Sequence, residues 1–258
     1  MKRLAGVLVA LIVAAGCGLG GGGSAREPVT AAPVEVAPSD EVTEEPVPEE
    51  TTTPPPSPSK AEPKPKKAKP TKTEDPNNFE MPACATREGK AVSKVKAESA
   101  LTAAAGKTYW PGSAPELKLP KRLVLATAWH ESGWTSNYVN CDGGRGLMQV
   151  MPDTEAFINQ RFEKAYDSHD YRENAVLGAN YLAWLTRAFG HSYFHDNYDL
   201  SAGKCRTHSS MCLLNMVISA YNAGRGAVDD MYGDRKLPNP AYVDSVRSLM
   251  KSCYCDRY

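Results

Sequence analysis

The sequence predicts a mainly α protein, with a single helical domain that carries disulfides and is preceded by a signal peptide and a disordered, proline-rich linker. Three observations predict this arrangement. Of the 20 prolines, 13 fall within residues 24–76, a stretch with almost no large apolar side chains. After that stretch, apolar residues recur at the i, i+3, i+4 spacing of helices. Six cysteines follow it, an even set of the kind that an exported chain can pair as disulfides.

The first 16 residues are predicted to be a lipoprotein signal peptide. Met1–Arg3 is basic, and Leu4–Ala15 is apolar but too short to span a bilayer. The run Ala-Ala-Gly-Cys that ends at Cys17 resembles a bacterial lipobox, which implies lipidation of Cys17 after cleavage. An ordinary signal peptide is the alternative. We therefore expect an exported protein that a lipid on Cys17 anchors to the cell membrane.

Residues 17–78 are predicted to be a disordered linker. Glu27–Glu50 is acidic and contains no lysine, whereas Lys60–Lys72 is mainly basic. Such a chain buries too little apolar surface to offset its conformational entropy. An extended, proline-rich chain reaches about 3.1 Å per residue, so the segment suits a long tether. The basic block is either a contact for anionic lipid or polymer, or part of a passive linker.

Residues 79–258 are predicted to fold as one domain. From Asn77 onward, 21 Lys and Arg side chains face 19 Asp and Glu. A nucleic-acid partner would usually show as a basic excess, so we exclude nucleic-acid-binding proteins as a class. We expect the protein to be a monomer. His191 and His195 could share a helical face with Asp196 adjacent, which would suit a metal ion, but the residues around them offer no evident further ligand. We interpret His191–Cys212 as a polar insertion that is constrained by cysteines, and we expect no metal ion there.

Apolar periodicity and glycine positions predict the helices of this domain. Helices are expected to end at glycines, which adopt the left-handed conformation of a C-terminal cap readily. The predicted ranges are 90–105, 120–132, a helix that begins at 152, about 172–189, 211–223, and a last helix that begins near 240.

The cysteines that remain after lipidation of Cys17 are disulfide candidates. Six cysteines allow 15 pairings, and the sequence does not choose among them. Cys253 and Cys255 are too close in sequence to favour pairing with each other, so we expect each to pair elsewhere. A disulfide from Cys141 would brace the loop in which it lies. The six candidates are Cys84, Cys141, Cys205, Cys212, Cys253 and Cys255.

Glu131 is the candidate catalytic residue. Val124, Thr127, Ala128 and Glu131 fall at i, i+3, i+4 and i+7, and so share the apolar face of a helix. Burial and the negative end of the helix dipole both raise the pKa of a carboxyl group, which then holds a proton near neutral pH. A general acid requires such a group. The alternatives are an exposed glutamate or a buried ion pair.

Four motifs follow one another in this region: Glu131-Ser132-Gly133, the run from Gly146 to Pro152, Ala220–Gly224, and Tyr242-Val243. In this order they resemble the soluble lytic transglycosylase (SLT) domain, a branch of the lysozyme-like superfamily. The resemblance covers roughly residues 119–249. It implies a lysozyme-like helical fold, a location facing the cell wall, and peptidoglycan glycan strands as the substrate.

The resemblance also implies substrate-binding residues around Glu131. Asn140 takes the place, by spacing, of a serine that contacts sugar in the family. A tyrosine in the Ala-Tyr-Asn motif would donate to the catalytic carboxyl group or stack beneath a sugar ring, or else pack in the core. Met151 is the weakest member, since methionine more often fills cores. The implied substrate-binding residues are Gln149, Tyr221, Asn222, Tyr242, Asn140 and Met151.

The family mechanism uses one carboxyl group and needs no cofactor. Glu131 would protonate the β-1,4 bond between N-acetylmuramic acid (MurNAc) and N-acetylglucosamine (GlcNAc), assisted by the substrate's acetamido group. It would then act as a base, so that the C6 hydroxyl closes a 1,6-anhydro ring. Two alternatives stay open. One is a hydrolytic muramidase similar to goose-type lysozyme, with Asp142 as the second carboxylate. The other is a non-catalytic lipoprotein that binds the cell wall.

Overall fold

The computed structural model of the chain describes residues 75–258. The predicted signal peptide, Cys17 and nearly all of the linker lie outside these residues. Within them, no helix is both long and apolar enough to cross a membrane. The mainly α prediction is confirmed. The elements are β1 (Thr86–Arg87), α1 (Lys94–Ala105), α2 (Lys121–Ser132), β2 (Tyr138–Val139), α3 (Pro152–Phe162), α4 (Tyr171–Tyr193), α5 (Leu213–Ala223), α6 (Arg225–Met231) and α7 (Pro240–Lys251), with 3-10 helices η1 (Ala202–Lys204) and η2 (Tyr254–Arg257).

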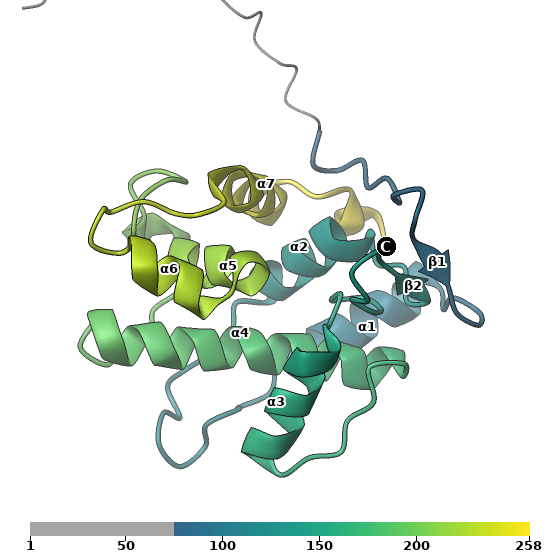
Figure 1. Ribbon diagram of the computed structural model, residues 1–258, viewed down its shortest axis with the longest axis horizontal. Coiled ribbons are helices and arrows are strands. Elements are labelled where there is room, and N and C mark those ends of the chain that lie inside the picture. Colours follow the sequence, from purple (N-terminus) through teal and green to yellow (C-terminus); the bar gives the residue numbers. More distant parts are fainter. Residues whose placement is uncertain (1–74) are drawn as a thin grey trace, which may run out of the picture. The chain divides into compact units, whose positions relative to one another are not determined.

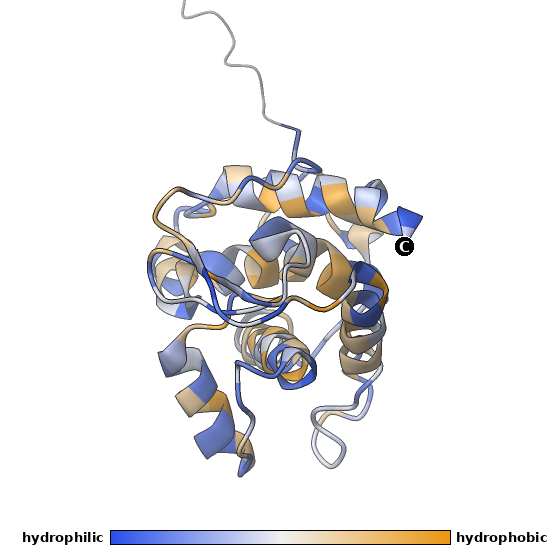
Figure 2. Cartoon of the chain, turned by 90° about the vertical axis from the view of Figure 1, so that its right-hand side faces the viewer, coloured by the Kyte–Doolittle hydropathy of each residue, from blue (hydrophilic) through white to orange (hydrophobic). Residues whose placement is uncertain are grey.

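Helix α4 is the centre of the domain (Figure 1). It packs against α1, α3 and α5, while α2 packs against α1 and α7. Hydrophobic residues gather on the sides of the helices that face one another (Figure 2). Gly178 of α4 lies directly under Met148, because a Cβ at this glycine would collide with the methionine side chain. The glycine therefore permits close packing of the loop that carries Met148 against α4.

The helix that carries Glu131 forms where the sequence predicted it. Pro120 caps α2 with φ −58°, one residue before the first helical residue. Gly133 ends it with φ 54°, in the left-handed region where glycine has little steric cost. β2 follows this helix and pairs in antiparallel fashion with β1, which precedes α1 in the chain, so that Thr86 lies opposite Val139. The end of α2 and the loop after it are therefore held by both a helix cap and a small sheet.

Three helix boundaries differ from the prediction, and one short helix was not predicted. Helix α1 starts at Lys94 rather than 90, because the Ser93 side chain accepts a hydrogen bond from the amide of Lys96 and caps it. Helix α4 continues past Gly190 to Tyr193. A Cβ at Gly190 would collide with the Tyr198 ring, so this glycine allows close packing of the ring and does not end the helix. Helix α5 begins after Cys212 rather than at 211. Helix α6, of seven residues, was not predicted because it is too short to show a period.

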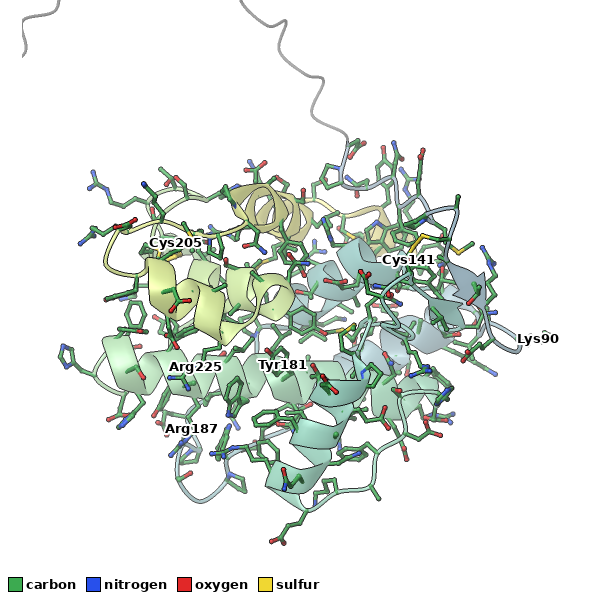
Figure 3. All side chains as sticks on the ribbon, viewed as in Figure 1. Lys90, Cys141, Tyr181, Arg187, Cys205 and Arg225 are labelled. Atoms are coloured by element: carbon green, nitrogen blue, oxygen red, sulfur yellow. A yellow bond between two sulfur atoms is a disulfide. The ribbon has the colours of Figure 1, made fainter. Side chains whose placement is uncertain are left out.

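Three disulfides pair the six cysteines of the domain. Cys84–Cys141 ties the chain before β1 to the loop after β2, and Cys205–Cys212 closes the insertion as expected (Figure 3). The third bond joins Cys253 to Cys255, so the expectation that these two pair elsewhere was wrong. The chain turns from an extended conformation at Cys253 into η2, which brings the two Cα atoms to 5.0 Å, within the usual range for a disulfide. Both side chains are buried there.

Candidate active site

Glu131 lies in the last turn of α2, half-buried on an apolar face. Val124, Thr127 and Ala128 on the same face are at most 1% exposed. Burial raises the pKa of Glu131 from 4.5 to about 7, although a hydrogen bond from Tyr242 lowers it in part. At this pKa, the carboxyl group exchanges its proton close to neutral pH, as a general acid requires.

Tyr242 of α7 is the direct partner of Glu131. Its hydroxyl donates a hydrogen bond to Oε1 of the carboxyl group. Burial, followed by the charge of Glu131, raises the pKa of Tyr242 well above 10, so the hydroxyl keeps its proton. The tyrosine ring meets the His130 ring edge-on at 4.7 Å. Burial lowers the pKa of His130, so no histidine cation competes for the carboxylate at neutral pH.

The loop from Arg145 to Gln149 is fastened from several elements. Asn174 of α4 accepts a hydrogen bond from the amide of Met148 and donates to the carbonyl of Arg145. Ser132, next to Glu131, donates to the carbonyl of Leu147 at 2.8 Å. Because these backbone groups belong to three of the four residues 145–148, the loop is fastened to both α4 and the end of α2.

Gln149 is the last residue of this loop, and its side-chain oxygen has no hydrogen-bond partner within residues 75–258. Its backbone has φ 49°, and its Nε2 donates to the carbonyl oxygens of Gly146 at 2.9 Å and Tyr138 at 3.3 Å. The residue is 8% exposed, and Oε1 has no hydrogen-bond partner within residues 75–258. A buried amide oxygen without a partner is costly, so it is a ready acceptor for a ligand.

Tyr221 lies beside Glu131 but does not donate to it. The resemblance allowed a tyrosine of the Ala-Tyr-Asn motif to reach the carboxyl group, but Tyr242 makes that contact. The Tyr221 hydroxyl donates instead to the carbonyl of Met148 at 2.8 Å. Burial and the nearby charge of Glu131 both raise the pKa of Tyr221. The structure thus brings Glu131, Gln149, Tyr221 and Tyr242 together.

The other implied substrate contacts lie around this group. Asn140 accepts hydrogen bonds from the amides of Asp142 and Gly144 through Oδ1, so its oxygen holds the loop. Met151 is 37% exposed, and its sulfur lies close to Gly144. Asn222 is exposed and accepts a hydrogen bond from Asn239 at 2.7 Å. None of these three contacts Glu131 through a hydrogen bond in the described part of the chain.

Asn174 and Ser132 are supporting residues that sequence reasoning did not single out. Asn174 is fully buried and also donates to the carbonyl of Ser168. Ser132 lies in the Glu131-Ser132-Gly133 motif, in which only the glutamate was given a chemical role, and Asn174 lies in a predicted helix to which no role was given. A buried asparagine inside an apolar helix was the one available signal, since such a group needs partners.

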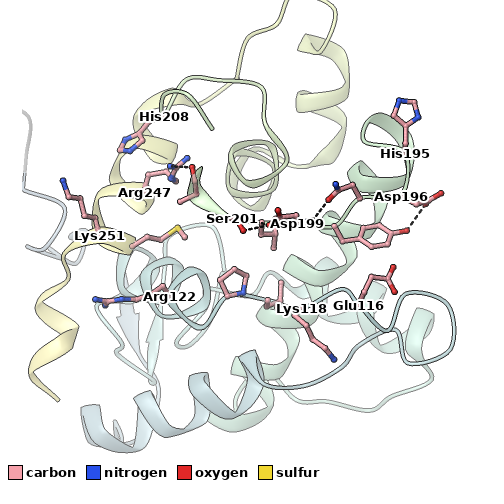
Figure 4. A pocket seen from close by; sticks show the side chains of 17 residues that line it. Glu116, Lys118, Arg122, His195, Asp196, Asp199, Ser201, His208, Arg247 and Lys251 are labelled. Atoms are coloured by element: carbon pink, nitrogen blue, oxygen red, sulfur yellow. Dashed lines mark hydrogen bonds between the residues drawn. The ribbon is translucent and has the colours of Figure 1, made fainter. Parts of the chain in front are cut away.

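A large cavity of the domain lies away from Glu131 (Figure 4). It has a volume of about 1150 Å³ and is lined by Pro120 and Arg122, at the opposite end of α2 from Glu131. The insertion forms one wall with Asp196 and Asp199. His191 of the insertion contacts Asp196 at 2.8 Å, and residues 75–258 hold no cluster of three His, Cys, Asp or Glu side chains suited to a metal ion.

Comparisons with known proteins match the region that contains this site. A family model described as the transglycosylase SLT domain matches residues 109–240, just over half of the 258 residues. The soluble lytic murein transglycosylases of Escherichia coli strains K12 and O157:H7 are each 28% identical over 136 residues, which is 50% of this chain and 18% of the relative. The chain thus matches under a fifth of the length of these relatives. The crystal structure of the 70 kDa soluble lytic transglycosylase from Escherichia coli aligns with 22% identity and a TM-score of 0.36, over 55% of this chain and 21% of that one.

Proposed function

The chain belongs to the transglycosylase SLT domain family, and from this premise we propose that it is a peptidoglycan lytic transglycosylase. It would be a carbon–oxygen lyase that cleaves the β-1,4 bond between MurNAc and GlcNAc and leaves a 1,6-anhydro-MurNAc end. The observation that carries this proposal is Glu131, a carboxyl group with a pKa of about 7 that is hydrogen-bonded by Tyr242.

Glu131 acts first as the acid. Because its pKa lies near neutral pH, a large fraction of the carboxyl groups hold a proton under physiological conditions. Tyr242 occupies Oε1, so Oε2 is the oxygen that faces the substrate. Its proton passes to the glycosidic oxygen, and the C1–O bond of MurNAc breaks. The acetamido oxygen of the same sugar stabilises the positive charge that develops at C1.

Glu131 then acts as the base. The carboxylate is stabilised by the hydrogen bond from Tyr242 while the GlcNAc end departs. It removes the proton of the C6 hydroxyl of MurNAc, whose oxygen bonds to C1 and displaces the acetamido oxygen. The ring closes, the acid is regenerated, and no water is consumed. One carboxyl group therefore completes the cycle, and no cofactor is required.

Gln149 supports substrate binding in this mechanism. Its Oε1 is buried and without a partner in the described residues, so an N–H or O–H of the sugar would satisfy it. Tyr221 holds the carbonyl of Met148, one residue earlier, and so keeps this oxygen in place. Asn140 and Met151, which meet at Gly144, would border the same sugar.

The proposal includes the cellular setting that the sequence indicates. A lipid on Cys17 would anchor the exported chain to the membrane, and the linker would allow the domain to reach the glycan strands. The domain would act as a monomer.

Asp142 supports one alternative reaction. The charges of Glu131 and Asp142 both raise the pKa of Tyr138, after burial, so both carboxyl groups lie near this tyrosine. Asp142 is exposed to solvent. In a hydrolytic muramidase, Asp142 would position a water molecule for attack on C1.

Mass spectrometry of the products from peptidoglycan tests the proposal, with the full mature chain and Glu131→Gln as the matched control. We expect 1,6-anhydro ends, lighter by one water than hydrolysed products, and no release by the control. Reducing ends that disappear in Asp142→Asn would establish hydrolysis instead. Wall binding without cleavage by the native chain would indicate the non-catalytic binder.

A further inference from the structure

The cavity at the start of α2 is separate from the candidate active site. Arg122 lines it and stands nine residues before Glu131 on the same helix, which at a rise of about 1.5 Å per residue is about 14 Å along the axis. Its volume of about 1150 Å³ exceeds the roughly 300–1,000 Å³ of most small-molecule pockets. We call it the insertion cavity, because residues of the insertion form one wall. It is large enough for a ligand of several residues.

Arg247 of α7 is a buried cation that lines the insertion cavity. The residue is only 8% exposed. Burial lowers its pKa, and within residues 75–258 no nearby carboxylate raises this pKa in compensation. A buried charge without an opposite charge is costly to the fold. An anionic group placed in the cavity would relieve this cost.

The guanidinium group of Arg247 is held in a fixed orientation. Its Nη1 donates to Oδ1 of Asn215, and its Nη2 donates to the carbonyl of Ala202 at 3.5 Å. Asn215 is fully buried, and its Nδ2 donates to three backbone carbonyls within residues 207–210, so its oxygen cannot turn away. The Nε of Arg247 makes no hydrogen bond within residues 75–258 and is not enclosed, so it opens into the cavity. The group is therefore oriented in advance for a ligand.

A structural role alone does not require the charge of Arg247. Its two acceptors, Asn215 and the carbonyl of Ala202, are both neutral. A neutral amide side chain could donate to them, without the cost of burying a cation. The positive charge is therefore the feature that calls for a further partner.

Two more basic side chains accompany Arg247, on the same side of the insertion cavity (Figure 4). Lys251 follows it by one helical turn on α7 and is exposed. Arg122 is half-buried and is already paired with Asp256. We call Arg247, Lys251 and Arg122 the basic end. Of the three, Arg247 and Lys251 have charge to offer a ligand.

Carboxyl groups lie at the opposite side of the insertion cavity, and we call Asp196 and Glu116 the acidic end (Figure 4). The contacts of His191 and Tyr198 with Asp196 are both made to Oδ1, which leaves Oδ2 for a ligand. The charge of Glu116 raises the pKa of Tyr198, so Glu116 lies near the same group. Lys118 lies on this side too, where its Nζ donates to a threonine hydroxyl.

The pattern of charges selects one class of ligand. Leu119, Leu200 and Met250 provide apolar wall in the same cavity. A short peptide with free ends carries a carboxylate at one end, an ammonium group at the other and apolar carbon atoms between them. A guanidinium group matches a carboxylate in both charge and shape. A simple anion would use the basic end only, and a polyanion would be repelled by the acidic end.

We propose that the insertion cavity binds a short peptide with both ends free. Its carboxylate bonds to Nε of Arg247 and to Lys251, and its amino group lies against Asp196 and Glu116. This inference goes beyond the proposed function, because it involves neither Glu131 nor the cleavage of glycan. The domain thus has a second binding site at the far end of the helix that carries the acid.

Calorimetric titration of the full mature chain with tetra-alanine, at low ionic strength, tests this inference. We expect tetra-alanine to bind at least about tenfold more tightly than its C-terminal amide, because a hydrogen bond between charged groups is worth about one tenfold step or more. N-acetyl-tetra-alanine should bind only about threefold more weakly than the free peptide, since the acidic end is exposed and its charges are screened by solvent.

Three variants locate the binding. Arg247→Gln keeps a donor for Asn215 but removes the charge, so the preference for the free carboxylate over the amide should disappear. Lys251→Gln changes an exposed side chain and does not endanger the fold, so it answers where Arg247→Gln fails to fold by circular dichroism. It should weaken binding of tetra-alanine about threefold. The matched control is Lys236→Gln, an exposed lysine outside the cavity, which should leave binding unchanged.

Three results overturn the inference. They are equal affinity of the native chain for tetra-alanine and its amide, no binding of tetra-alanine at millimolar concentrations, and binding of acetate as tight as that of tetra-alanine. The last would show that one cation, without the rest of the cavity, accounts for the affinity. Competition by soluble wall fragments that keep their peptides identifies the source of the ligand: displacement of tetra-alanine assigns the site to peptides attached to the wall, and no displacement assigns it to free peptides.

Discussion

The hydroxyl of Tyr242 donates a hydrogen bond to Oε1 of Glu131 across a sequence separation of 111 residues. The bond joins the last turn of α2 to the first turn of α7. It stabilises the carboxylate more than the carboxylic acid, and so moderates the rise in pKa that burial causes. Removing this hydrogen bond should therefore raise the pKa of Glu131.

Tyr242→Phe should shift the pH dependence of cleavage upward. Without the donor, the pKa of Glu131 rises further, so the limb that reports loss of the acid's proton moves to higher pH by about one unit. The rate should fall about tenfold or more, because negative charge develops on Glu131 as it protonates the glycosidic oxygen, and the missing hydrogen bond no longer stabilises that charge. A pH profile of kcat/KM measures both. An unshifted limb would contradict the role of Tyr242, and Tyr193→Phe, an exchange outside the site, serves as the control.

Native activity should decline as the pH rises through about 7, the pKa of Glu131. Only the protonated carboxyl group can donate to the glycosidic oxygen, so kcat/KM follows its fraction. Initial rates of wall cleavage between pH 5 and 9 at constant ionic strength measure this limb. A rate that stays constant up to pH 9 would exclude Glu131 as the acid.

Glu131→Gln should stabilise the folded protein at alkaline pH. The folded pKa of about 7 exceeds the unfolded value near 4.5, so the native state binds more protons and loses stability as the pH rises between these values. Above pH 7, the neutral amide avoids a cost on the order of 3 kcal/mol. Urea unfolding at pH 4 and pH 8 measures the difference, which should be small at pH 4 and favour the variant at pH 8. A variant that is less stable than the native protein at pH 8 would contradict the prediction, because it would mean that the buried carboxylate of Glu131 does not destabilise the fold.

Asn174→Ala should destabilise the domain and impair cleavage together. The fully buried amide bonds to Met148, Arg145 and Ser168, and its loss leaves their backbone groups without partners, at about 1–3 kcal/mol each at most. We expect a total near 3 kcal/mol by urea unfolding. The exposed amide of Gln160 on α3 offers a control, since Gln160→Ala should change stability by less than about 0.5 kcal/mol. A similar small effect at Asn174 would refute its clamping role.

The Cys84–Cys141 disulfide should stabilise the domain more than the Cys205–Cys212 disulfide. The first spans 57 residues and the second 7, so it restricts the unfolded chain more strongly. Replacing each pair by alanines should lower the free energy of unfolding by about 4 and about 2 kcal/mol respectively. Equilibrium unfolding without reductant measures both values. The reverse order would mean that native contacts of the insertion, rather than loop closure, dominate.

Local patterns predicted much of this domain. The helix that carries Glu131, its end at Gly133 and its apolar face all follow from residues within one or two turns, because capping and periodicity act at short range. The same holds for the start of α3 at Pro152 and the parity of the cysteines. Two helix ends differed from the prediction. Helix α1 begins later because the Ser93 side chain caps it, and α4 continues past Gly190, which packs against the ring of Tyr198.

Only the tertiary structure decided which groups meet. Tyr242 rather than Tyr221 donates to Glu131, Tyr221 holds the carbonyl of Met148, and Cys253 pairs with Cys255. Cys253 and Cys255 meet because the chain turns there into η2. The two tyrosine contacts join residues far apart in the sequence, so their separation does not predict their distance. They are selected by the packing of α2, α5 and α7 against one another, because a close-packed interior leaves each side chain few positions. The sequence by itself thus determined most of the helices and the position of Glu131 on an apolar helix face, whereas the packing of those helices determined which hydroxyl group bonds to its carboxyl group.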